Sequence, residues 1–341
     1  MAVTTLIGLD IGSTSIRAVE AGTGKEGPML LHYAEVLLPP GAVQSGVVQD
    51  ARAVTAGLRQ LRAAAPFKSK RVVLGITNMQ AVVREMSVAN LPAKDLRASL
   101  PFQVRDLLPL PVERSILDFL PLEDPGRGEN VRGLLVAAPK EPILVAVNAV
   151  EDAGLTVVRV DLASLALLRA VARLDDEVEA IVDVGTQITT VIVHTDGVPL
   201  IVRTIPRGSA EITSAVATRL GVPLPEAEAL KCQIGLWPEN GPQVAETVRE
   251  AIRPLLNEIR GSFAYLNTSG RHSQVSRLVL AGGGGQLPGL SETLAAQLDL
   301  EVEHADPLAR LRPTRRARHE GVESVPLAAT VSIGLTLGSA A

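Results

Sequence analysis

Two short segments, one near the start of the chain and one past its middle, share the pattern Asp-x-Gly followed by a hydroxyl residue. The first is Asp10-Ile11-Gly12-Ser13-Thr14, and the second is Asp183-Val184-Gly185-Thr186, followed by Thr190. In each, a glycine lets the backbone approach a ligand closely, and the amides and hydroxyls that follow can bind phosphate oxygens. Two such segments facing each other would clamp the phosphates of a nucleotide.

A third segment of this kind is the run Gly282-Gly283-Gly284-Gly285, which follows the apolar residues 278–280. A helix is predicted to begin soon after it, at about Leu290. A strand that ends in a glycine loop against a helix N-terminus lets a flat base or a ribose lie against the backbone. Each of the three segments alone is also a common turn or tight connection, and the spacing is not that of the dinucleotide fingerprint. Together, and in this order, they favour a nucleotide site.

The elements around these segments follow an α/β pattern. Apolar runs flank both Asp-Gly turns, which predicts two β-hairpins of the same design, at residues 5–19 and 180–193. Further strands are predicted at residues 29–37, 71–76, 155–160, 198–205 and 277–281. Helices are predicted at residues 50–64, 140–153, 162–174, 210–220, 224–234 and 243–266, with a kink expected at Pro254. The duplicated hairpin predicts two halves of similar topology.

Residues 80–139 interrupt this pattern. They contain predicted strands at residues 81–88, 115–122 and 131–138 and a predicted helix at residues 93–108, with prolines at the boundaries. This composition indicates a small inserted α+β subdomain. The predicted division is a first lobe of residues 1–79 and 140–174, the insertion of residues 80–139, a second lobe of residues 175–207 and 277–341, and a helical subdomain of residues 208–276.

Composition narrows the class of protein. Hydrophobic residues make up 46% of the 341 residues but aromatic residues only 2%, so the core must be aliphatic. The net charge of −4 is too small and too mixed for a nucleic-acid binder. The single Cys232, predicted to lie in the core, rules out an internal disulfide and fits a reducing compartment. The start of the chain lacks the pattern of an export signal, and the uncharged residues 325–341 are better explained by a buried helix than by a membrane tail.

The three segments resemble, in order, the phosphate-1, phosphate-2 and adenosine motifs of the actin, Hsp70 and sugar-kinase superfamily. The resemblance implies an actin-like (ribonuclease H-like), two-lobed duplicated fold with ATP in the cleft between the lobes. It also assigns residues 162–174 and 327–336 as two connecting helices at the lobe interface. Gly334 would lie where these helices cross closely.

Within the superfamily, the chain is similar to the PilM family of type IV pilus assembly proteins, in the bacterial branch that also contains the cell-division protein FtsA. The place of the insertion, the segment of residues 102–111 and the segment of residues 136–141 carry this likeness. It implies a cytoplasmic ATP-binding scaffold at the cytoplasmic face of the inner membrane. Such a scaffold would bind the N-terminal tail of a PilN-like membrane protein between the first lobe and the insertion, and would contact the pilus motor ATPases.

The resemblance also assigns roles to residues. Asp10 and Asp183 would hold Mg²⁺ through water, since Mg²⁺ keeps much of its hydration and takes few carboxylates. Phosphate contacts are assigned to Gly12, Ser13, Thr14 and Arg17 in the first lobe and to Gly185, Thr186 and Thr190 in the second. Glu228 would accept hydrogen bonds from the ribose hydroxyls, and Lys231 would lie along the base. The nucleotide-binding set is completed by Gly208, Gly282, Gly283, Gly284 and Gly285.

Several positions depart from the family pattern or allow a second interpretation. Arg17 stands where the family usually has lysine, and Val191 stands where FtsA-like sequences often have aspartate. Asp161 is the candidate catalytic base by resemblance, or else a cap of the helix that follows. Glu228 and Lys231 could be an ordinary exposed pair three residues apart on a helix. These departures predict slow ATP hydrolysis at most.

Two alternatives from other classes remain at this stage. A small-molecule kinase of the superfamily would need a carboxylate base that faces an acceptor hydroxyl. A filament-forming relative of FtsA would need self-association through the lobes, of which a weak form is also compatible with a scaffold. The basic run at residues 312–318 is expected to be a solvated loop, with contact to an acidic partner or to lipid headgroups as the alternative.

Overall fold

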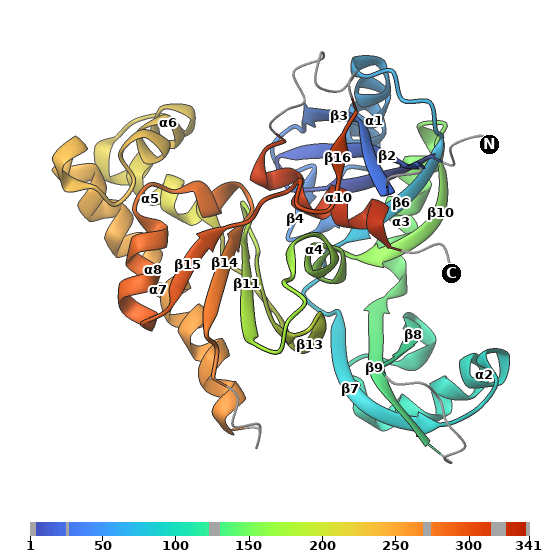
Figure 1. Ribbon diagram of the computed structural model, residues 1–341. Helices are drawn as coiled ribbons and strands as arrows, with labels where there is room; N and C mark the ends of the chain where they lie inside the picture. Colours follow the sequence, from blue (N-terminus) through green and yellow to red (C-terminus); the bar gives the residue numbers. More distant parts are fainter. Residues whose placement is uncertain (1–4, 25–26, 123–129, 269–273, 315–324, 339–341) are drawn as a thin grey trace.

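The computed structural model describes residues 5–24, 27–122, 130–268, 274–314 and 325–338. Two sheets dominate it, each with helices against its faces, and a smaller sheet projects from the first (Figure 1). We call the unit built on the six-stranded sheet the first lobe and the unit built on the five-stranded sheet the second lobe. Among the described residues, no helix has both the length and the apolar composition needed to cross a bilayer.

The first-lobe sheet has the strand order β10-β6-β1-β2-β3-β16. Its strands are β1 (Thr5–Ile11), β2 (Ser15–Gly24), β3 (Gly27–Leu37), β6 (Arg71–Ile76), β10 (Thr156–Leu162) and the short β16 (Arg312–Pro313). Two helices, α1 (Ala51–Ala64) and α3 (Lys140–Asp152), pack together beside it, and the small hairpin of β4 (Val43–Gln44) and β5 (Val47–Val48) precedes α1. Helix α1 begins where the Asp50 side chain accepts a hydrogen bond from the Ala53 amide at 3.0 Å.

The second-lobe sheet has the order β13-β12-β11-β14-β15. Its strands are β11 (Val178–Val184), β12 (Thr189–Thr195), β13 (Val198–Ile205), β14 (Arg277–Ala281) and β15 (Glu301–His304). Its helices are α5 (Ser209–Leu220), α6 (Leu224–Ile234), α7 (Pro242–Thr268) and α8 (Leu290–Leu298). Aliphatic side chains from the sheet and these helices form one core. The predicted kink does not divide α7, since Pro254 lies inside one continuous helix.

The two hairpins predicted from the sequence are confirmed, and they are built alike. Strand β1 pairs antiparallel with β2 so that Asp10 faces Arg17, and β11 pairs with β12 so that Asp183 faces Thr190. The same backbone hydrogen bond closes each turn: from Gly12 N to the Ser15 oxygen at 3.0 Å, and from Gly185 N to the Ile188 oxygen at 2.9 Å. Each central strand also has a parallel neighbour on its other side, β6 or β14. The structure is therefore duplicated down to single hydrogen bonds.

The chain leaves the first lobe between β6 and α3 to form the inserted unit. This unit contains β7 (Val82–Ala89), α2 (Ala93–Val104), β8 (Ser115–Pro121) and β9 (Asn130–Pro139), with strand order β7-β9-β8. Helix α2 is shorter than the predicted helix, because residues 105–107 form a 3₁₀ turn instead. The unit has its own small core and contacts the second lobe where β7 meets β13 (Figure 1).

Two helices fill the space between the lobes, α4 (Ala163–Val171) and α10 (Thr330–Leu337). They cross closely, since a Cβ on Gly334 would lie 1.8 Å from the Ala166 carbonyl oxygen. Helix α10 also lies against β1, where a Cβ on Gly8 would lie 2.0 Å from the Ser332 oxygen. Buried aliphatic residues from both sheets and both helices form the interlobe core. The expected crossing at Gly334 is confirmed, although α4 is shorter than predicted and Leu162 belongs to β10.

The predicted solvated loop at residues 312–318 is wrong in its first two residues. Arg312 and Pro313 pair with Met29 and Leu30 of β3, so they belong to the first-lobe sheet although the prediction placed residues 277–341 in the second lobe. Their pairing partners lie more than 280 residues earlier, so no local pattern could indicate the strand. Residues 315–318 lie outside the described residues. The lobe and subdomain boundaries given above stay predictions.

Candidate nucleotide-binding site

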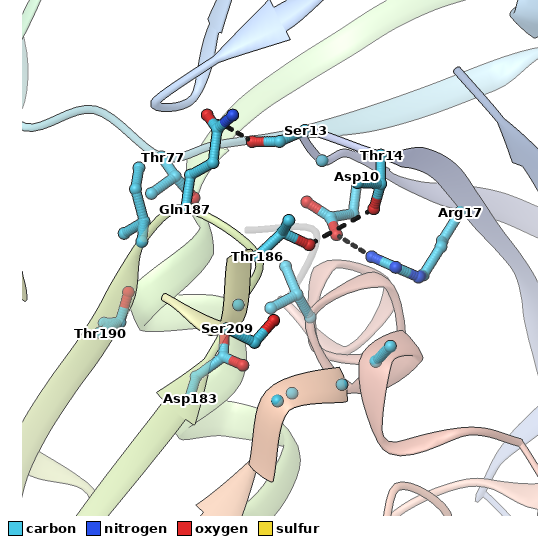
Figure 2. Close-up of a pocket in the computed structure, with 18 of the residues that line it drawn as sticks. Asp10, Ser13, Thr14, Arg17, Thr77, Asp183, Thr186, Gln187, Thr190 and Ser209 are labelled. Atoms are coloured by element: carbon cyan, nitrogen blue, oxygen red, sulfur yellow. Dashed lines mark hydrogen bonds and ion pairs between the residues drawn. The ribbon is translucent and has the colours of Figure 1, made fainter. Parts of the chain in front are cut away.

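A cavity of about 470 Å³ lies between the two lobes. Both Asp-Gly hairpins line it, one from each lobe, together with the glycine run after β14 and the face of α6 that carries Lys231. Figure 2 shows the two hairpins approaching each other, with Thr14 and Thr186 joined across the site at 3.4 Å. The structure thus brings together three segments that are more than 90 residues apart in the sequence.

Most residues assigned to the site from the sequence line this cavity. They are Asp10, Gly12, Ser13, Thr14, Arg17, Asp183, Gly185, Thr186, Thr190, Glu228, Lys231, Gly282, Gly283 and Gly284. Two predicted glycines do not line it. Gly208 supports the second hairpin from behind, because a Cβ there would lie 2.5 Å from the Thr186 oxygen. Gly285 is buried beside Leu280.

Gly282 is the glycine that the site requires most clearly. It has a φ of 77°, in the region that favours glycine, and a Cβ would lie 2.2 Å from the Asp183 carboxylate and 2.5 Å from the Val184 oxygen. Within the predicted glycine loop, Gly283–Gln286 form a 3₁₀ turn. The bare backbone of this turn therefore forms one wall of the cavity.

The electrostatics of the cavity centre on two carboxylates. Burial, together with the nearby charge of Asp10, raises the pKa of Asp183 to about 6. Burial also raises the pKa of Asp10, an effect that the Arg17 guanidinium at 3.6 Å only partly offsets. Arg17 is itself held by Glu35 at 2.9 Å. Two partly buried carboxylates that repel each other beside these glycine turns fit a divalent cation, and Mg²⁺ in particular usually takes one or two carboxylates plus phosphate and water.

The other end of the cavity holds Glu228 and Lys231. Lys231 Nζ donates to Glu228 at 2.7 and 2.9 Å and to the Thr213 hydroxyl at 3.0 Å, and only 4% of its side chain is exposed. The interpretation as an ordinary exposed pair is therefore wrong for the lysine. Cys232 was expected in the core, but it is exposed and lines the cavity. Its position on α6, one residue after the buried Lys231, turns it toward the cavity.

Asp161 does not line the cavity. Its carboxylate forms an ion pair with Arg169, whose guanidinium also donates to the Gly334 carbonyl oxygen at 3.4 Å. It does not cap α4 either, since that helix begins after Leu162 without a side-chain cap. Asp161 therefore joins β10 to α4 at the helix crossing, and its position does not support a role as catalytic base.

Several residues that line the cavity were not predicted from the sequence. Gln187, from the second hairpin, accepts hydrogen bonds from the Ser13 hydroxyl at 3.2 Å and from the Ser45 amide at 2.8 Å. Gly46, Thr77 and Ser209 also line the cavity. Ser45 and Gly46 form the tip of the β4–β5 hairpin, and nothing in a two-residue turn indicates a cavity elsewhere in the fold. Gln187 lies inside the second hairpin motif, so it is the one of these residues that the sequence could have indicated.

The buried histidines have structural surroundings. His194 lies fully buried with Nε2 3.0 Å from Glu179, whose carboxylate also accepts a hydrogen bond from Arg277 at 2.6 Å. His32 is buried beside Phe67. Within the described ranges, no three histidine, cysteine, aspartate or glutamate side chains gather as a metal-binding group. The two carboxylates of the interlobe cavity remain the candidate cation ligands.

Solved structures similar to this chain support the fold. A chain of the PilM-PilN type IV pilus biogenesis complex has 25% sequence identity and a TM-score of 0.85, and the match covers 97% of each chain. The ethanolamine utilization protein EutJ of Carboxydothermus hydrogenoformans has 16% identity and a TM-score of 0.62, over 99% of this chain and 91% of that one. MreB5 of Spiroplasma citri bound to ADP has 12% identity and a TM-score of 0.54, over 98% and 95%. These neighbours confirm the predicted actin-like α/β fold.

The family assignment comes from the sequence match. The model of the family described as type IV pilus assembly protein PilM matches residues 8–340, nearly the whole chain. The match includes both hairpins, the inserted unit and both connecting helices. The chain therefore belongs to the PilM family of type IV pilus assembly proteins.

Proposed function

We propose that this protein binds Mg-ATP between its lobes and serves as a scaffold of type IV pilus assembly. The observation that carries the nucleotide proposal is the meeting of the two hairpins, Asp10 and Asp183 in one cavity. Glycine amides and hydroxyls from both sides suit phosphate oxygens, and the carboxylates suit a hydrated cation that neutralises those phosphates. The glycine run and Glu228 would hold the nucleoside.

Slow turnover at most is proposed for the bound nucleotide. A hydrolase needs a base or a water-positioning group beside the last phosphate. Among the described cavity-lining residues, the carboxylates are Asp10, Asp183 and Glu228. The first two are assigned to the cation, and the third is held by Lys231 and Thr213. The site is therefore better suited to holding Mg-ATP than to cleaving it.

For the partner, we propose the N-terminal cytoplasmic tail of a PilN-like membrane protein. The PilM-PilN complex is a structural neighbour, and the inserted unit offers a surface of the required kind. Strand β8 is an edge strand with Ile116 and Leu120 exposed on its outer face, so an extended peptide could pair with it or pack on it. Nearby, α3 exposes Leu144, and Arg114, directly before β8, lies 3.9 Å from Glu141 of α3.

The proposed place of the protein follows from that partner. Held by a PilN-like tail, the chain would lie at the cytoplasmic face of the inner membrane without inserting into it. From there it would contact the pilus motor ATPases. The relative position of the two lobes would depend on which nucleotide is bound. The contact between β7 and β13 supports such a link, because it joins the inserted unit to the second lobe.

The test is a titration of a synthetic PilN-tail peptide into the protein, with and without Mg-ATP, by isothermal calorimetry. Ile116→Asp and Leu144→Asp should each weaken binding at least about tenfold, since a charge on an apolar contact surface opposes desolvation. Leu224→Asp, at an exposed position on α6 in the second lobe, is the matched control. If the wild-type protein shows no binding of the peptide, either with or without Mg-ATP, the proposed partner is refuted. Weakening by Leu224→Asp as large as the others would refute the proposed surface.

A further inference from the structure

We propose that Gln187 is a latch that discriminates between nucleoside diphosphates and triphosphates, because its side-chain oxygen competes with the terminal phosphate for the same donors of the first lobe. The inference rests on the proposed nucleotide binding and concerns which nucleotide the closed cleft favours. It assigns a role to a residue that points across the cleft rather than toward the nucleoside end of the cavity.

The contacts of Gln187 cross from one lobe to the other. Gln187 follows Thr186 in the turn of the second hairpin, yet its Oε1 atom accepts from the Ser13 hydroxyl at 3.2 Å and from the Ser45 amide at 2.8 Å. A carbonyl oxygen has two lone pairs, so these two donors satisfy it. Figure 2 shows the Gln187 side chain reaching to Ser13 beside Thr77. This one side chain therefore links two separate first-lobe segments to the second lobe.

The Ser45 amide of the first lobe is held in place. Ser45 and Gly46 have φ angles of 47° and 76°, as in a two-residue hairpin turn that favours glycine, and they join β4 to β5. A Cβ on Gly46 would lie 2.0 Å from the Thr77 carbonyl oxygen, so the tip of this hairpin rests directly on the backbone after β6. The Ser45 amide cannot retreat from the cleft, whereas Gln187 can turn away about its rotatable side-chain bonds. The glutamine is thus the movable partner.

The position of the latch matches the end of a triphosphate. A nucleoside held by Glu228 and the glycine run would direct its phosphates between the hairpins, and the last phosphate would then lie beside Ser13, Gly46 and Thr77. A phosphate oxygen and the Gln187 oxygen are both acceptors, so they compete for the Ser13 hydroxyl and the Ser45 amide. A diphosphate, one phosphate shorter, leaves both donors to Gln187. The latch should therefore close the lobes over a diphosphate and yield to a triphosphate.

The test uses Gln187→Ala, Gln187→Glu and the control Gln44→Ala in the full chain. Gln44 is an exposed glutamine on β4 that does not line the cavity. Amide hydrogen exchange in the absence of nucleotide measures the protection that the contact gives to the Ser45 amide. Calorimetry with Mg-ADP and Mg-ATP measures the affinity for each nucleotide. In Gln187→Ala, exchange of the 43–48 segment should accelerate about tenfold. ATP should bind about three- to tenfold more tightly, because it no longer displaces the glutamine, and the affinity for ADP should not change. In Gln187→Glu, the added negative charge should weaken ATP more than ADP.

The outcomes separate this inference from the proposed function. Unchanged exchange of the 43–48 segment in Gln187→Ala would overturn the latch. If the wild-type protein binds both nucleotides and Gln187→Ala changes both affinities by the same factor, or changes neither, the competition is overturned and nucleotide binding stands. If the wild-type protein binds neither nucleotide, the proposed function and the competition fail together. The same changes in Gln44→Ala would also overturn the inference, since they would show a general loosening of the hairpin.

Discussion

Gly334 of α10 and Ala166 of α4 meet with no room for a side chain, since a Cβ on the glycine would lie 1.8 Å from the alanine's carbonyl oxygen. The contact lies where both connecting helices pass between the lobes, so any added atom must push one helix away from the other. We expect Gly334→Ala to lower the free energy of unfolding by about 3 kcal/mol, as overpacking in a core does. Urea unfolding followed by circular dichroism would measure it.

The chain contains a matched control for this substitution. Gly261 lies inside α7 with nothing within 4 Å of its would-be Cβ. Gly261→Ala should therefore raise the free energy of unfolding by about 0.5–1 kcal/mol, because alanine favours the helix and restricts the unfolded chain. A Gly334→Ala protein as stable as Gly261→Ala would contradict the close crossing.

Asp183 makes the stability of the protein depend on pH and on Mg²⁺. Its pKa of about 6 in the fold is above the ordinary value of 3.8, so the fold favours the protonated form. The group contributes stability below pH 4 that is lost as the pH rises to about 6. In EDTA, Asp183→Asn should therefore gain little at pH 4 and up to about 3 kcal/mol over wild type at pH 7. Chemical unfolding at both pH values measures the difference.

The same substitution should abolish the stabilisation of the protein by Mg-ATP, because the proposed cation ligand is gone. Asp176→Asn, at an exposed carboxylate between α4 and β11, should change neither property. An Asp183→Asn gain that is equal at pH 4 and pH 7 would mean that the charge of Asp183 is not the cause.

Arg17 separates the effect of charge from that of geometry. Its guanidinium contacts Asp10 at 3.6 Å and Glu35 at 2.9 Å, which fixes its head group beside the first hairpin. Arg17→Lys keeps the charge but loses the planar fork. We expect ATP affinity to fall less than about threefold in Arg17→Lys and more than about tenfold in Arg17→Met, measured by calorimetry. Equal losses in both variants would show that the fork, rather than the charge, matters.

We expect Glu228 to contribute to the binding of the nucleoside and not to the binding of the phosphates. It lies at the Lys231 end of the cavity, where hydrogen bonds from Lys231 and Thr213 outweigh partial burial and hold its pKa below the ordinary value. Glu228→Gln keeps the shape and removes the charge, so ATP binding should weaken about tenfold. Inorganic tripolyphosphate should bind Glu228→Gln and wild type equally.

Glu226→Gln, an exposed carboxylate on the same helix, controls for the change in charge. Competition against a fluorescent ATP analogue measures all of these ligands in one format. If tripolyphosphate weakens as much as ATP in Glu228→Gln, the cavity binds nucleotides in another orientation.

The sequence was most informative where a local pattern has only one structural solution. An aspartate and a glycine between two apolar runs predict a hairpin, and both hairpins formed at the expected residues. Gly334 could be placed because the resemblance to the actin superfamily assigns two connecting helices to the lobe interface. These features depend on residues near one another in the chain, together with the order of motifs along it.

The rest depended on pairings that no local pattern contains. Asp161 sits at a position where a base or a cap was plausible, but Arg169, eight residues on, takes its carboxylate. Cys232 follows the buried Lys231, and only the orientation of α6 shows that it faces the cavity. The hydrogen bond of Gln187 joins it to Ser45, 142 residues away, so only the fold shows it. Each of these depends on how distant elements are placed, which composition and periodicity do not encode.

The close packing of α10 on the first-lobe sheet has a consequence for synthesis. The Ser332 hydroxyl donates to the Arg17 carbonyl oxygen across a separation of 315 residues, so β1 and β2 receive their covering helix almost last. A nascent chain that has formed β1, β2, β3, β6 and β10 still presents the bare face around Gly8 to solvent while the second lobe is being made. Such a face can associate with other chains before it is covered. Ribosome-bound intermediates of this protein should therefore be prominent clients of chaperones until residues 330–337 emerge.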